Sequence, residues 1–384
     1  MEKLFLILIF FAISIAVAYF LLIASYCYAW LMMKRPALNK INPVFVSIII
    51  AARNEENNII QCLDAIVKQS YDKYEIIVVD DASTDSTNLL IRNYSEKHSN
   101  VTLITLSEDR KNTGKKFAIK TGIEKAAGEL IVTTDADCTM GRDWLRSIVS
   151  FYSETNSQMI VAPVCFQNEQ TMFEKIQSLE FMALVACGGA SLYYNHAIMC
   201  NGANLVYPKK IFEEMNGFEN IDEKASGDDV LLMYKIKRKY PKGINFLKSE
   251  DAIVYTEANK NFKSFIQQRK RWASKGLRFF NIETKLVSLL VYCFCFVLVA
   301  FPVIGTICLN NTIFYPDFME ICLILLLIKC FIDFLLLFLS ASFFKKKELL
   351  VYFLPEQLVY MLYVVLVGLI GTRGKYEWKG RQMN

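Results

Sequence analysis

Histidine, proline and glycine are all scarce in this chain of 384 residues. It has 2 histidines, 8 prolines and 16 glycines, and no segment repeats with a fixed period. So little proline and glycine argues against a collagen-like or linker-dominated protein, and the lack of a repeat argues against a solenoid. Because His98 and His196 are the only histidines, we expect any bound metal to have oxygen ligands, which favours Mg2+ or Mn2+.

An excess of one charge is also lacking. The 43 Lys and Arg residues and the 38 Asp and Glu residues leave a net charge of +5, dispersed along the chain. Nucleic-acid binding needs a concentrated basic stripe, so we expect no nucleic-acid partner. The 11 cysteines show neither a disulfide framework nor zinc-ligand spacing. Hydrophobic residues, in contrast, make up 54% of the chain, which is too many for an ordinary soluble protein.

Long apolar segments at both ends predict membrane helices. Segment 1–33 is uncharged from residue 4 onwards, and about 20 apolar residues are enough to cross a bilayer. Segment 286–371 contains further apolar stretches and predicts about three helices, followed by a basic tail at 372–384. Lys329 and Asp333 stand four residues apart in that region. We expect them to share a helix face, either as a structural ion pair or as part of a polar path.

Basic residues beside the apolar segments indicate the cytoplasmic side of the membrane. Lys34 and Arg35 follow the first segment, and Lys345–Lys347 follow the third. We therefore predict a multi-pass protein of the cell inner membrane whose central domain faces the cytoplasm. The basic tail conflicts with simple alternation of the helices. The last apolar segment, which contains Glu356, is therefore a candidate for an interfacial or re-entrant piece.

The central segment, residues 43–275, alternates strand-like apolar runs with helix-like segments. This alternation predicts an α/β fold, with a mostly parallel sheet that carries helices on both faces. Ligands of such sheets bind where the strands end, so we expect functional residues just after the strands. The predicted strands are Val46–Ala51, Glu75–Val79, Val101–Leu106 and Glu129–Thr134.

Pairs of aspartates stand at two of these strand ends. Asp80 and Asp81 follow the run EIIVV, and Asp135 and Asp137 follow ELIVTT. Because a single residue separates Asp135 from Asp137, both carboxylates can converge on one hard cation, which can in turn neutralise a diphosphate. The alternative is that these aspartates begin turns or cap the next helix.

A third pair of acids, Asp228 and Asp229, follows Gly227 at the predicted start of an amphipathic helix. Helix capping is again the alternative to a functional role. One acid is sufficient for a cap, so we expect at least one carboxylate to point into a cleft. A carboxylate placed there could act as a general base.

The run QQRKRW precedes the second apolar segment. Gln268, Arg271 and Trp272 stand at positions i, i+3 and i+4, which places them on one face of a helix. Arginine can bind a phosphate, and a tryptophan face can stack on a sugar ring. The alternative is a basic interfacial helix whose tryptophan lies among lipid headgroups.

Taken in order, six segments resemble the membrane-bound glycosyltransferases of family 2. They are VSIIIAARNEE, VVDDASTDST, TTDADC, GANLVYPKKIFEEMNGF, SGDDVLL and QRKRW. The resemblance covers roughly residues 43–275. It implies a GT-A fold, a Rossmann-like and mostly parallel sheet, in a cytoplasmic domain with flanking transmembrane helices. It also implies a nucleotide-diphosphate sugar donor, UDP-linked in our interpretation, with a divalent cation and inversion at the anomeric carbon.

The resemblance assigns roles to individual residues. It implies that Asp229 is the catalytic base, with Asp228 beside it where family members often have glutamate. It implies that Asp137 and Asp135 form the metal site, with Asp137 as the more direct ligand. The implied donor-binding residues are Ala51, Arg53, Glu55, Asp80 or Asp81, Lys115 or its neighbour Lys116, Asp135, Asp137 and Arg271. The implied acceptor-binding residues are Gly202, Ala203, Asn204, Gln268 and Trp272.

The number of membrane helices bears on the acceptor. Family members that extrude a polysaccharide usually have more than the about four helices expected here, so we expect transfer of one sugar to a lipid or lipid-linked acceptor, as in ceramide glucosyltransferases. The first alternative is a processive synthase of the poly-N-acetylglucosamine or hyaluronan type, because such synthases share QxxRW. The second is an inactive relative that serves as a membrane scaffold, although its clustered acids would then repel one another without a ligand.

Overall fold

A computed structural model describes residues 2–36, 41–107, 114–219, 227–278, 281–309, 315–370, 376–378 and 381–383. The chain divides into two compact units. The helical unit comprises Met1–Met32, Gln170–Ala190 and Asn259–Gly374, and the sheet unit comprises Met33–Glu169, Ser191–Ala258 and Lys375–Asn384. The interval 43–275, which we expected to be one continuous domain, is therefore shared between the two units.

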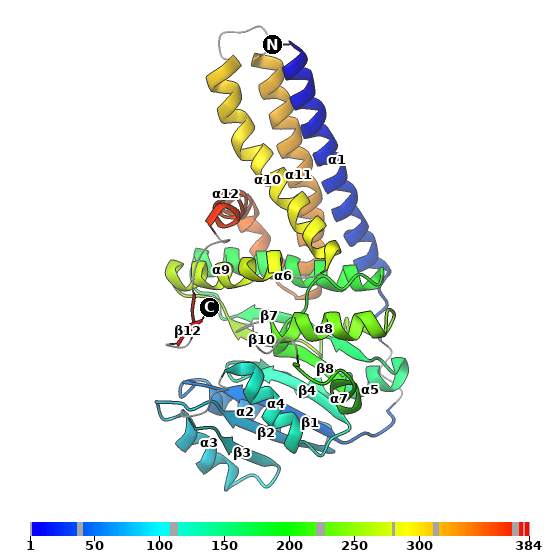
Figure 1. Ribbon diagram of the computed structural model, residues 1–384, viewed down its shortest axis with the longest axis vertical. Coiled ribbons are helices and arrows are strands. Elements are labelled where there is room, and N and C mark those ends of the chain that lie inside the picture. Colours follow the sequence, from blue (N-terminus) through cyan, green and yellow to red (C-terminus); the bar gives the residue numbers. More distant parts are fainter. Residues whose placement is uncertain are drawn as a thin grey trace. The chain divides into compact units, whose positions relative to one another are not determined.

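Within the described part of the chain, the sheet unit is built on a seven-stranded sheet in the order β3-β2-β1-β4-β8-β6-β9 (Figure 1). Strands β3, β2, β1 and β4 are parallel, β8 is antiparallel to both of its neighbours, and β9 is parallel to β6. The mostly parallel α/β sheet predicted from the sequence is confirmed. The strands are β1 (Val46–Ala52), β2 (Tyr74–Asp80), β3 (Val101–Thr105), β4 (Leu130–Asp135), β6 (Met159–Val161), β8 (Leu205–Pro208) and β9 (Ile244–Phe246).

The strand order reverses beside β1. The chain passes from β1 through β2 to β3 and then returns to β4 on the other side of β1. At such a reversal the connections after the two neighbouring strands diverge and leave a crevice for a ligand. Ala51 pairs with Asp135 and Ala52 pairs with Asp80 in the strand register, so the ends of β1, β2 and β4 are level.

Helices cover this sheet. α2 (Ile59–Val67) and α3 (Thr87–Ser95) contact each other, as expected when successive right-handed connections proceed in one direction. α4 (Lys115–Lys125) makes the return crossing and packs on β1 and β2. Gly122 permits this close approach, because a Cβ there would lie 2.7 Å from Ile49 Cγ2. This unit also contains α5 (Trp144–Thr155), η1 (Gly202–Asn204), α7 (Lys209–Glu214) and α8 (Asp228–Lys239).

Two smaller sheets also belong to the sheet unit. In the first, β10 (Val254–Glu257) lies between β5 (Thr139–Met140) and β7 (Val164–Gln167). In the second, β11 (Tyr376–Trp378) pairs antiparallel with β12 (Arg381–Met383). The second sheet falls in the segment 372–384, which the sequence predicted only as a basic tail.

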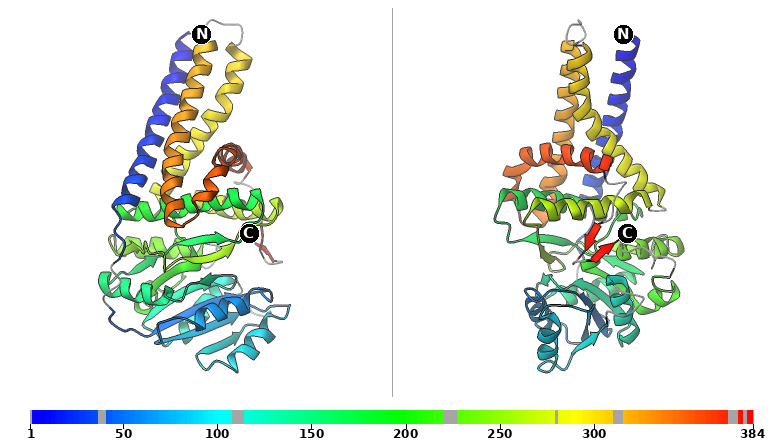
Figure 2. Two further views of the ribbon diagram at one scale, coloured as in Figure 1. Left: turned by 180° about the vertical axis from the view of Figure 1, so that it is seen from behind. Right: turned by 60° about the vertical axis from the view of Figure 1, so that its left-hand side comes forward.

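The helical unit contains long helices, of which α1, α10 and α11 run side by side (Figures 1 and 2). Its helices are α1 (Glu2–Met32), α6 (Met172–Tyr193), α9 (Phe262–Arg278), α10 (Ile282–Leu309), α11 (Tyr315–Phe343), η2 (Lys347–Tyr352) and α12 (Phe353–Ile370). Five of the described helices are long and apolar enough to cross a membrane. They lie at Leu6–Met32, Met172–Tyr193, Ile282–Ile307, Pro316–Phe343 and Lys347–Leu369.

Four of these five segments coincide with the predicted membrane segments, and α6 is the additional one. The sequence did not reveal α6 because Glu174, Gln177 and Glu180 interrupt its apolar run at intervals of three residues. All three side chains are buried in the structure. Their spacing places them on one helix face. Glu180 has partners on α9 and α12, Gln177 bonds Asn259 before α9, and Glu174 accepts from Thr171 at the start of α6 itself.

The predicted pairing of Lys329 with Asp333 is confirmed within α11. The Lys329 ammonium is fully buried and also donates to Gln357 Oε1 of α12 at 2.6 Å. Tyr19 of α1 donates its hydroxyl hydrogen to Asp333 Oδ1 at 2.7 Å. The pair therefore joins three helices, which supports the structural alternative stated above.

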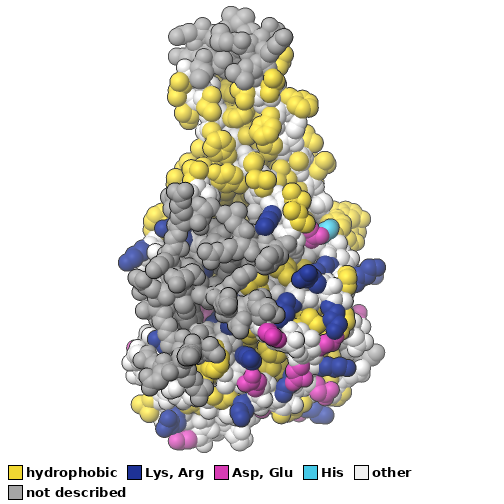
Figure 3. All heavy atoms as spheres, viewed as in Figure 1, with side chains coloured by type: hydrophobic (Ala, Val, Ile, Leu, Met, Phe, Trp, Pro, Cys, Tyr) yellow, Lys and Arg dark blue, Asp and Glu magenta, His cyan; other side chains and the backbone are white. Residues whose placement is uncertain are grey.

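The surfaces of the two units differ in character. On the face shown in Figure 3, hydrophobic side chains cover the long helices, whereas acidic and basic side chains are interspersed over the sheet unit. Phe10, Ile307 and Phe331 are 75%, 77% and 66% exposed on α1, α10 and α11. Large apolar side chains exposed to this degree are expected where helices face lipid.

Candidate active site

The predicted functional residues of the sheet unit gather where β1, β2 and β4 end. Asp135 is the last residue of β4, and Asp80 is the last residue of β2. α4 begins with Lys115 on the return crossing between β3 and β4. The reversal of the strand order therefore brings side chains from widely separated parts of the sequence to one edge of the sheet.

Lys115 and Asp135 form an ion pair at this edge. Both side chains are partly open to solvent, with exposed fractions of 26% and 34%. Lys116 is buried instead, with 8% exposure. Of the two lysines that the sequence left as alternatives, Lys115 is thus the one beside the carboxylates.

Asp229 joins this group through Gly202. The Gly202 amide donates to Asp229 Oδ2 at 3.2 Å, and the Gly202 carbonyl accepts from the Thr133 hydroxyl at 3.0 Å. A Cβ placed on Gly202 would lie 3.5 Å from Lys115 Nζ and 3.5 Å from Asp229 Cβ. The Asp229 side chain and the Lys115 ammonium therefore both lie close to a residue that carries no side chain.

The ends of β1 and β2 form a second part of the same edge. Arg53 donates through Nη1 to the carbonyl oxygens of Asp81 and Ala82 at 2.6 and 2.7 Å. Asp81 Oδ1 accepts from the Gly114 amide at 3.2 Å, which ties this loop to the start of α4. Asp81 is thus fixed beside the residue that precedes Lys115.

Asp80 has a different environment. Its Oδ1 accepts from the Ser83 amide at 3.1 Å, and its Oδ2 accepts from Asn88 Nδ2 at 2.8 Å. Both oxygens therefore stabilise the turn after β2 and the start of α3. This corresponds to the turn-forming alternative.

Glu55 is also buried, with 8% exposure. Its amide donates to the Thr87 hydroxyl at 2.8 Å, and its Oε2 accepts from Asn58 Nδ2 at 2.9 Å. Ala51 lies within β1 opposite Asp135. These residues shape the edge of the sheet near the predicted nucleoside position.

The residues present fit a hard divalent cation that also has ligands from the substrate. Asp137 is exposed and Asp135 is half-buried, and carboxylate oxygens are the ligands that Mg2+ and Mn2+ favour. Among the described residues, no group of three or more His, Cys, Asp or Glu side chains is placed to hold a metal. A cation here would therefore complete its shell with phosphate oxygens and water, as Mg2+ commonly does.

Two buried thiols lie behind these carboxylates. Cys138 donates to Asp137 Oδ1 at 3.6 Å, and Cys62 donates to the Asp135 carbonyl at 3.6 Å. Burial raises the pKa of both thiols, and the negative charges of Asp137 and Asp135 raise the pKa further. Both cysteines therefore stay protonated at neutral pH and act as weak hydrogen-bond donors.

The predicted acceptor residues Gly202, Ala203 and Asn204 form η1. Asn204 is fully buried, and its amide donates to the Pro163 and Ala252 carbonyls at 2.8 Å each. Its Oδ1 accepts from Trp144 Nε1 at 3.1 Å. The side chain of Asn204 therefore joins the start of α5 to the segments before β7 and β10, and we assign it a structural role.

The remaining predicted residues are not among the contacts described above. Gln268, Arg271 and Trp272 lie on α9, which belongs to the helical unit. Asp228 is the first residue of α8, directly before Asp229. The side chains of Asp228 and Trp272 lie outside the described part of the chain.

Three residues at this edge were not predicted from the sequence, namely Thr133, Cys138 and Gly114. The first two act through hydrogen bonds whose partners are visible only in the structure. Gly114 has φ +103°, which favours glycine. A glycine directly before the predicted lysine is the one sequence signal that could have identified any of the three.

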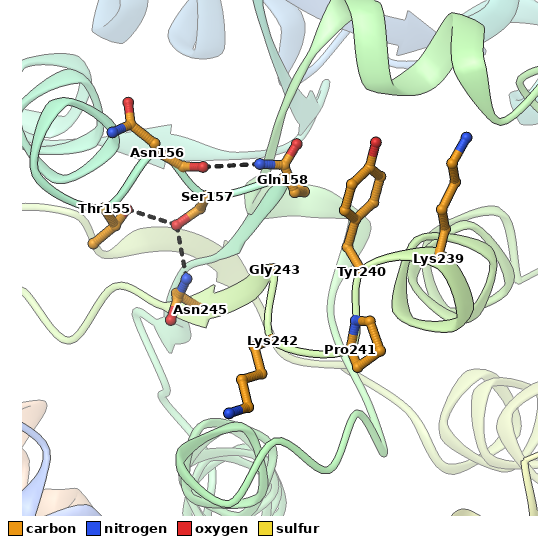
Figure 4. A pocket seen from close by; sticks show the side chains of 10 residues that line it. All are labelled: Thr155, Asn156, Ser157, Gln158, Lys239, Tyr240, Pro241, Lys242, Gly243 and Asn245. Atoms are coloured by element: carbon orange, nitrogen blue, oxygen red, sulfur yellow. Dashed lines mark hydrogen bonds between the residues drawn. The ribbon is translucent and has the colours of Figure 1, made fainter.

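A separate hollow of about 550 Å³ lies elsewhere in the sheet unit (Figure 4). It is lined by the ends of α5 and α8 and the starts of β6 and β9, and Lys239 and Tyr240 mark the end of α8. Asp229 is at the opposite end of α8. None of the predicted site residues lines this hollow.

The chain matches a known protein family over part of its length. Residues 47–215 match the family model of glycosyl transferase family 2. The chain carries a family 2 glycosyltransferase domain. The matched segment includes Asp80, Asp81, Lys115, Asp135, Asp137 and Gly202.

Two curated relatives match part of this chain. The glycosyltransferase AglE of Haloferax volcanii is 31% identical over 190 residues, which cover 48% of this chain and 59% of that protein. The poly-beta-1,6-N-acetyl-D-glucosamine synthase of Staphylococcus aureus is 24% identical over 245 residues, which cover 63% of this chain and 57% of that protein. The chain thus spans less than two thirds of the length of these relatives.

A solved structure shares the fold of this chain. The mannosyltransferase PcManGT from Pyrobaculum calidifontis, in complex with GDP-Man and Mn2+, matches with a TM-score of 0.57 and 20% identity. The match covers 95% of this chain and 100% of that chain. The predicted GT-A fold is thereby confirmed.

Proposed function

We propose that this protein is a membrane-bound, inverting glycosyltransferase that transfers one sugar from a UDP-linked donor to a lipid or lipid-linked acceptor. The observation that supports this most is the grouping of Lys115, Asp135 and Asp229 around Gly202. A carboxylate that we propose to bind a cation, a basic side chain and a second carboxylate are neighbours there, which supports a site for one small ligand.

The proposed reaction is a single displacement. The acceptor hydroxyl oxygen attacks the anomeric carbon, and the bond from that carbon to the diphosphate oxygen breaks as the new bond forms. The diphosphate leaves with the electron pair, and Asp229 accepts the proton of the hydroxyl group. Attack opposite the leaving group inverts the anomeric configuration.

The other charged groups stabilise the leaving diphosphate. Lys115 places an ammonium next to it and would neutralise part of its growing negative charge. Asp137 and Asp135 are the residues that would hold Mg2+ or Mn2+, and such a cation would supply further charge neutralisation. The complex of PcManGT with GDP-Man and Mn2+ supports this pairing of a nucleotide sugar with a divalent cation.

Residues Arg53, Glu55 and Asp81 are proposed to contact the nucleoside. We also propose that Arg271 binds the diphosphate and that Gln268 and Trp272 contact the acceptor. These roles follow from the family resemblance. The catalytic unit is proposed to face the cytoplasm at the inner membrane, because basic residues flank the predicted membrane segments.

A processive synthase is the second candidate. It is favoured by the similarity of this chain to the poly-beta-1,6-N-acetyl-D-glucosamine synthase of Staphylococcus aureus. Single transfer is favoured by the small number of helices suited to cross a membrane in the described part of the chain.

One assay separates these candidates. Membranes containing the protein are incubated with Mn2+ and radiolabelled nucleotide sugars, and the products are partitioned between organic solvent and an aqueous polymer fraction. We expect label in the organic phase, dependent on the divalent cation. A ladder of long aqueous products would favour the synthase, and no incorporation from any donor would indicate an inactive scaffold.

A further inference from the structure

The side chain of Gln268 on α9 is held in one orientation. Its Oε1 accepts hydrogen bonds from Arg269 Nη1 at 2.8 Å and from Asn259 Nδ2 at 3.0 Å. A guanidinium has donors and no acceptor, so the Gln268 atom that faces Arg269 must be the amide oxygen. Because the amide group is planar, this contact also fixes the direction of the Gln268 Nε2 donor.

Arg269 itself is anchored inside the helical unit. It is 4% exposed and forms an ion pair with Glu180 of α6, whose side chain is 6% exposed. The second oxygen of Glu180 accepts from the hydroxyl of Tyr363 on α12. The guanidinium also lies 4.5 Å from the centre of the Phe265 ring. Burial lowers the pKa of Arg269, but Glu180 and Tyr363 together raise it by more, so the pKa lies above its usual value and the residue remains a cation.

Asn259, the second donor, is anchored to the same helix. Its backbone amide donates to Gln177 Oε1 at 3.2 Å, and its carbonyl accepts from Gln177 Nε2 at 2.9 Å. Gln177 is 1% exposed on α6. Both groups that fix Gln268 are therefore positioned by buried polar residues of α6, one helical turn apart.

From these contacts we propose that Arg269 is a positioning residue that presents the Nε2 amide of Gln268 as a hydrogen-bond donor to an oxygen atom of the acceptor. This inference rests on the proposed function. It goes beyond it by specifying the recognised atom, because an oriented amide donor selects an oxygen with a lone pair. The proposal also assigns a role to the buried Glu180 of α6, because its carboxylate holds the guanidinium that orients Gln268.

A purely structural role for Arg269 makes a different prediction, and a double-mutant cycle separates the two. The variant Arg269→Lys keeps the charge beside Glu180 but loses the planar fork that can bind two partners at once. We expect it to raise the KM for the acceptor by about fivefold to tenfold, the range expected when one hydrogen bond is lost. In a Gln268→Ala background the same change should alter that KM by less than about twofold, because the group that Arg269 orients is already absent.

The control variant is Lys263→Met, which removes an exposed positive charge from the first turn of α9 and should leave the acceptor KM unchanged. Melting temperatures of all variants are measured in parallel. If Arg269→Lys unfolds the protein, the neutral pair Glu180→Gln with Arg269→Gln replaces it in the cycle.

The possible outcomes are distinct. An equal rise in KM with and without the Gln268 side chain would overturn the positioning role. A wild-type protein that transfers no sugar would overturn the proposed function, and with it this inference. A KM effect that depends on Gln268 would support both.

Discussion

Three different elements of the sheet unit position the central residues of the candidate site. Lys115 begins α4, Asp135 ends β4, and Asp229 lies in the first turn of α8. The positions of Asp135 and Asp229 could be predicted from the sequence, because acids directly after a strand and at a helix start are visible in it. Lys115 was assigned only through the family resemblance, with Lys116 as the alternative. In the structure, Lys116 is buried and Lys115 pairs with Asp135.

The hydrogen-bond partners of Asn204 could not be predicted from the sequence. Its partners Trp144, Pro163 and Ala252 lie 60, 41 and 48 residues away along the chain. Only the fold brings such distant groups into contact. A polar residue that the family resemblance assigned to the acceptor site is therefore part of the core.

We predict that Lys248 makes the stability of the folded protein depend on pH. It is 8% exposed, and burial, followed by the charge of Arg35, lowers its pKa to about 8. Below that pH the folded protein carries a buried charge. As pH rises from about 8 to 10.5, the folded state loses the proton that the unfolded state keeps, so stability increases. We expect Lys248→Met to raise the free energy of unfolding at pH 7 by on the order of 1–3 kcal/mol.

The increase in the free energy of unfolding that we expect for Lys248→Met should shrink as the pH approaches 10. The measurement is unfolding of the purified full-length protein in detergent at pH 7 and pH 10. Lys242→Met, which removes an exposed lysine, is the matched control. A difference between wild type and Lys248→Met that does not change with pH would contradict the assignment.

At the scale of elements, the regular alternation of strands and helices was predictable, and the partition of the central segment was not. β1 to β4 emerged from short runs of Val and Ile. α6 was not predicted as a membrane-type helix. Its acids and amides are typical of a solvent-exposed helix face unless their buried partners are known. Arg269 and Tyr363, which satisfy Glu180, lie 89 and 183 residues away along the chain.

The packing of α4 on the sheet can be tested at Gly122. A Cβ there would lie 2.7 Å from Ile49 Cγ2 and 3.2 Å from Val79 Cγ2, so a larger side chain must displace the helix. We expect Gly122→Leu to lower the free energy of unfolding by about 1–3 kcal/mol. It should also reduce transferase activity, because Lys115 begins the same helix.

The control is Gly141→Ala, since a Cβ on Gly141 would meet nothing within 4 Å. Denaturant unfolding and transfer assays are run on both variants. If Gly122→Leu matched the wild type in both measurements, α4 could not be the rigid support for Lys115 that the structure describes.

At the scale of the whole molecule, the chain combines a family 2 glycosyltransferase domain with helices that are suited to a membrane. The order of the sequence motifs was sufficient to predict the family and the GT-A fold. The acceptor was not predictable. In our proposal, its recognition involves Gln268 of α9, whose orientation depends on contacts that only the structure reveals. Arg269 and Asn259, which hold Gln268, are themselves anchored by Glu180 and Gln177 of α6, 89 and 82 residues away along the chain.

The most direct test of the account is the turnover of Asp229→Asn compared with wild type, using purified protein with saturating donor and Mn2+. The substitution keeps the shape of the side chain and removes the proton acceptor. We predict a fall in kcat of about 10²- to 10⁴-fold, with nucleotide binding retained and with Asp251→Asn, an exposed acid of the same unit, unaffected. Turnover of Asp229→Asn at the wild-type rate would contradict the central claim that Asp229 is the base.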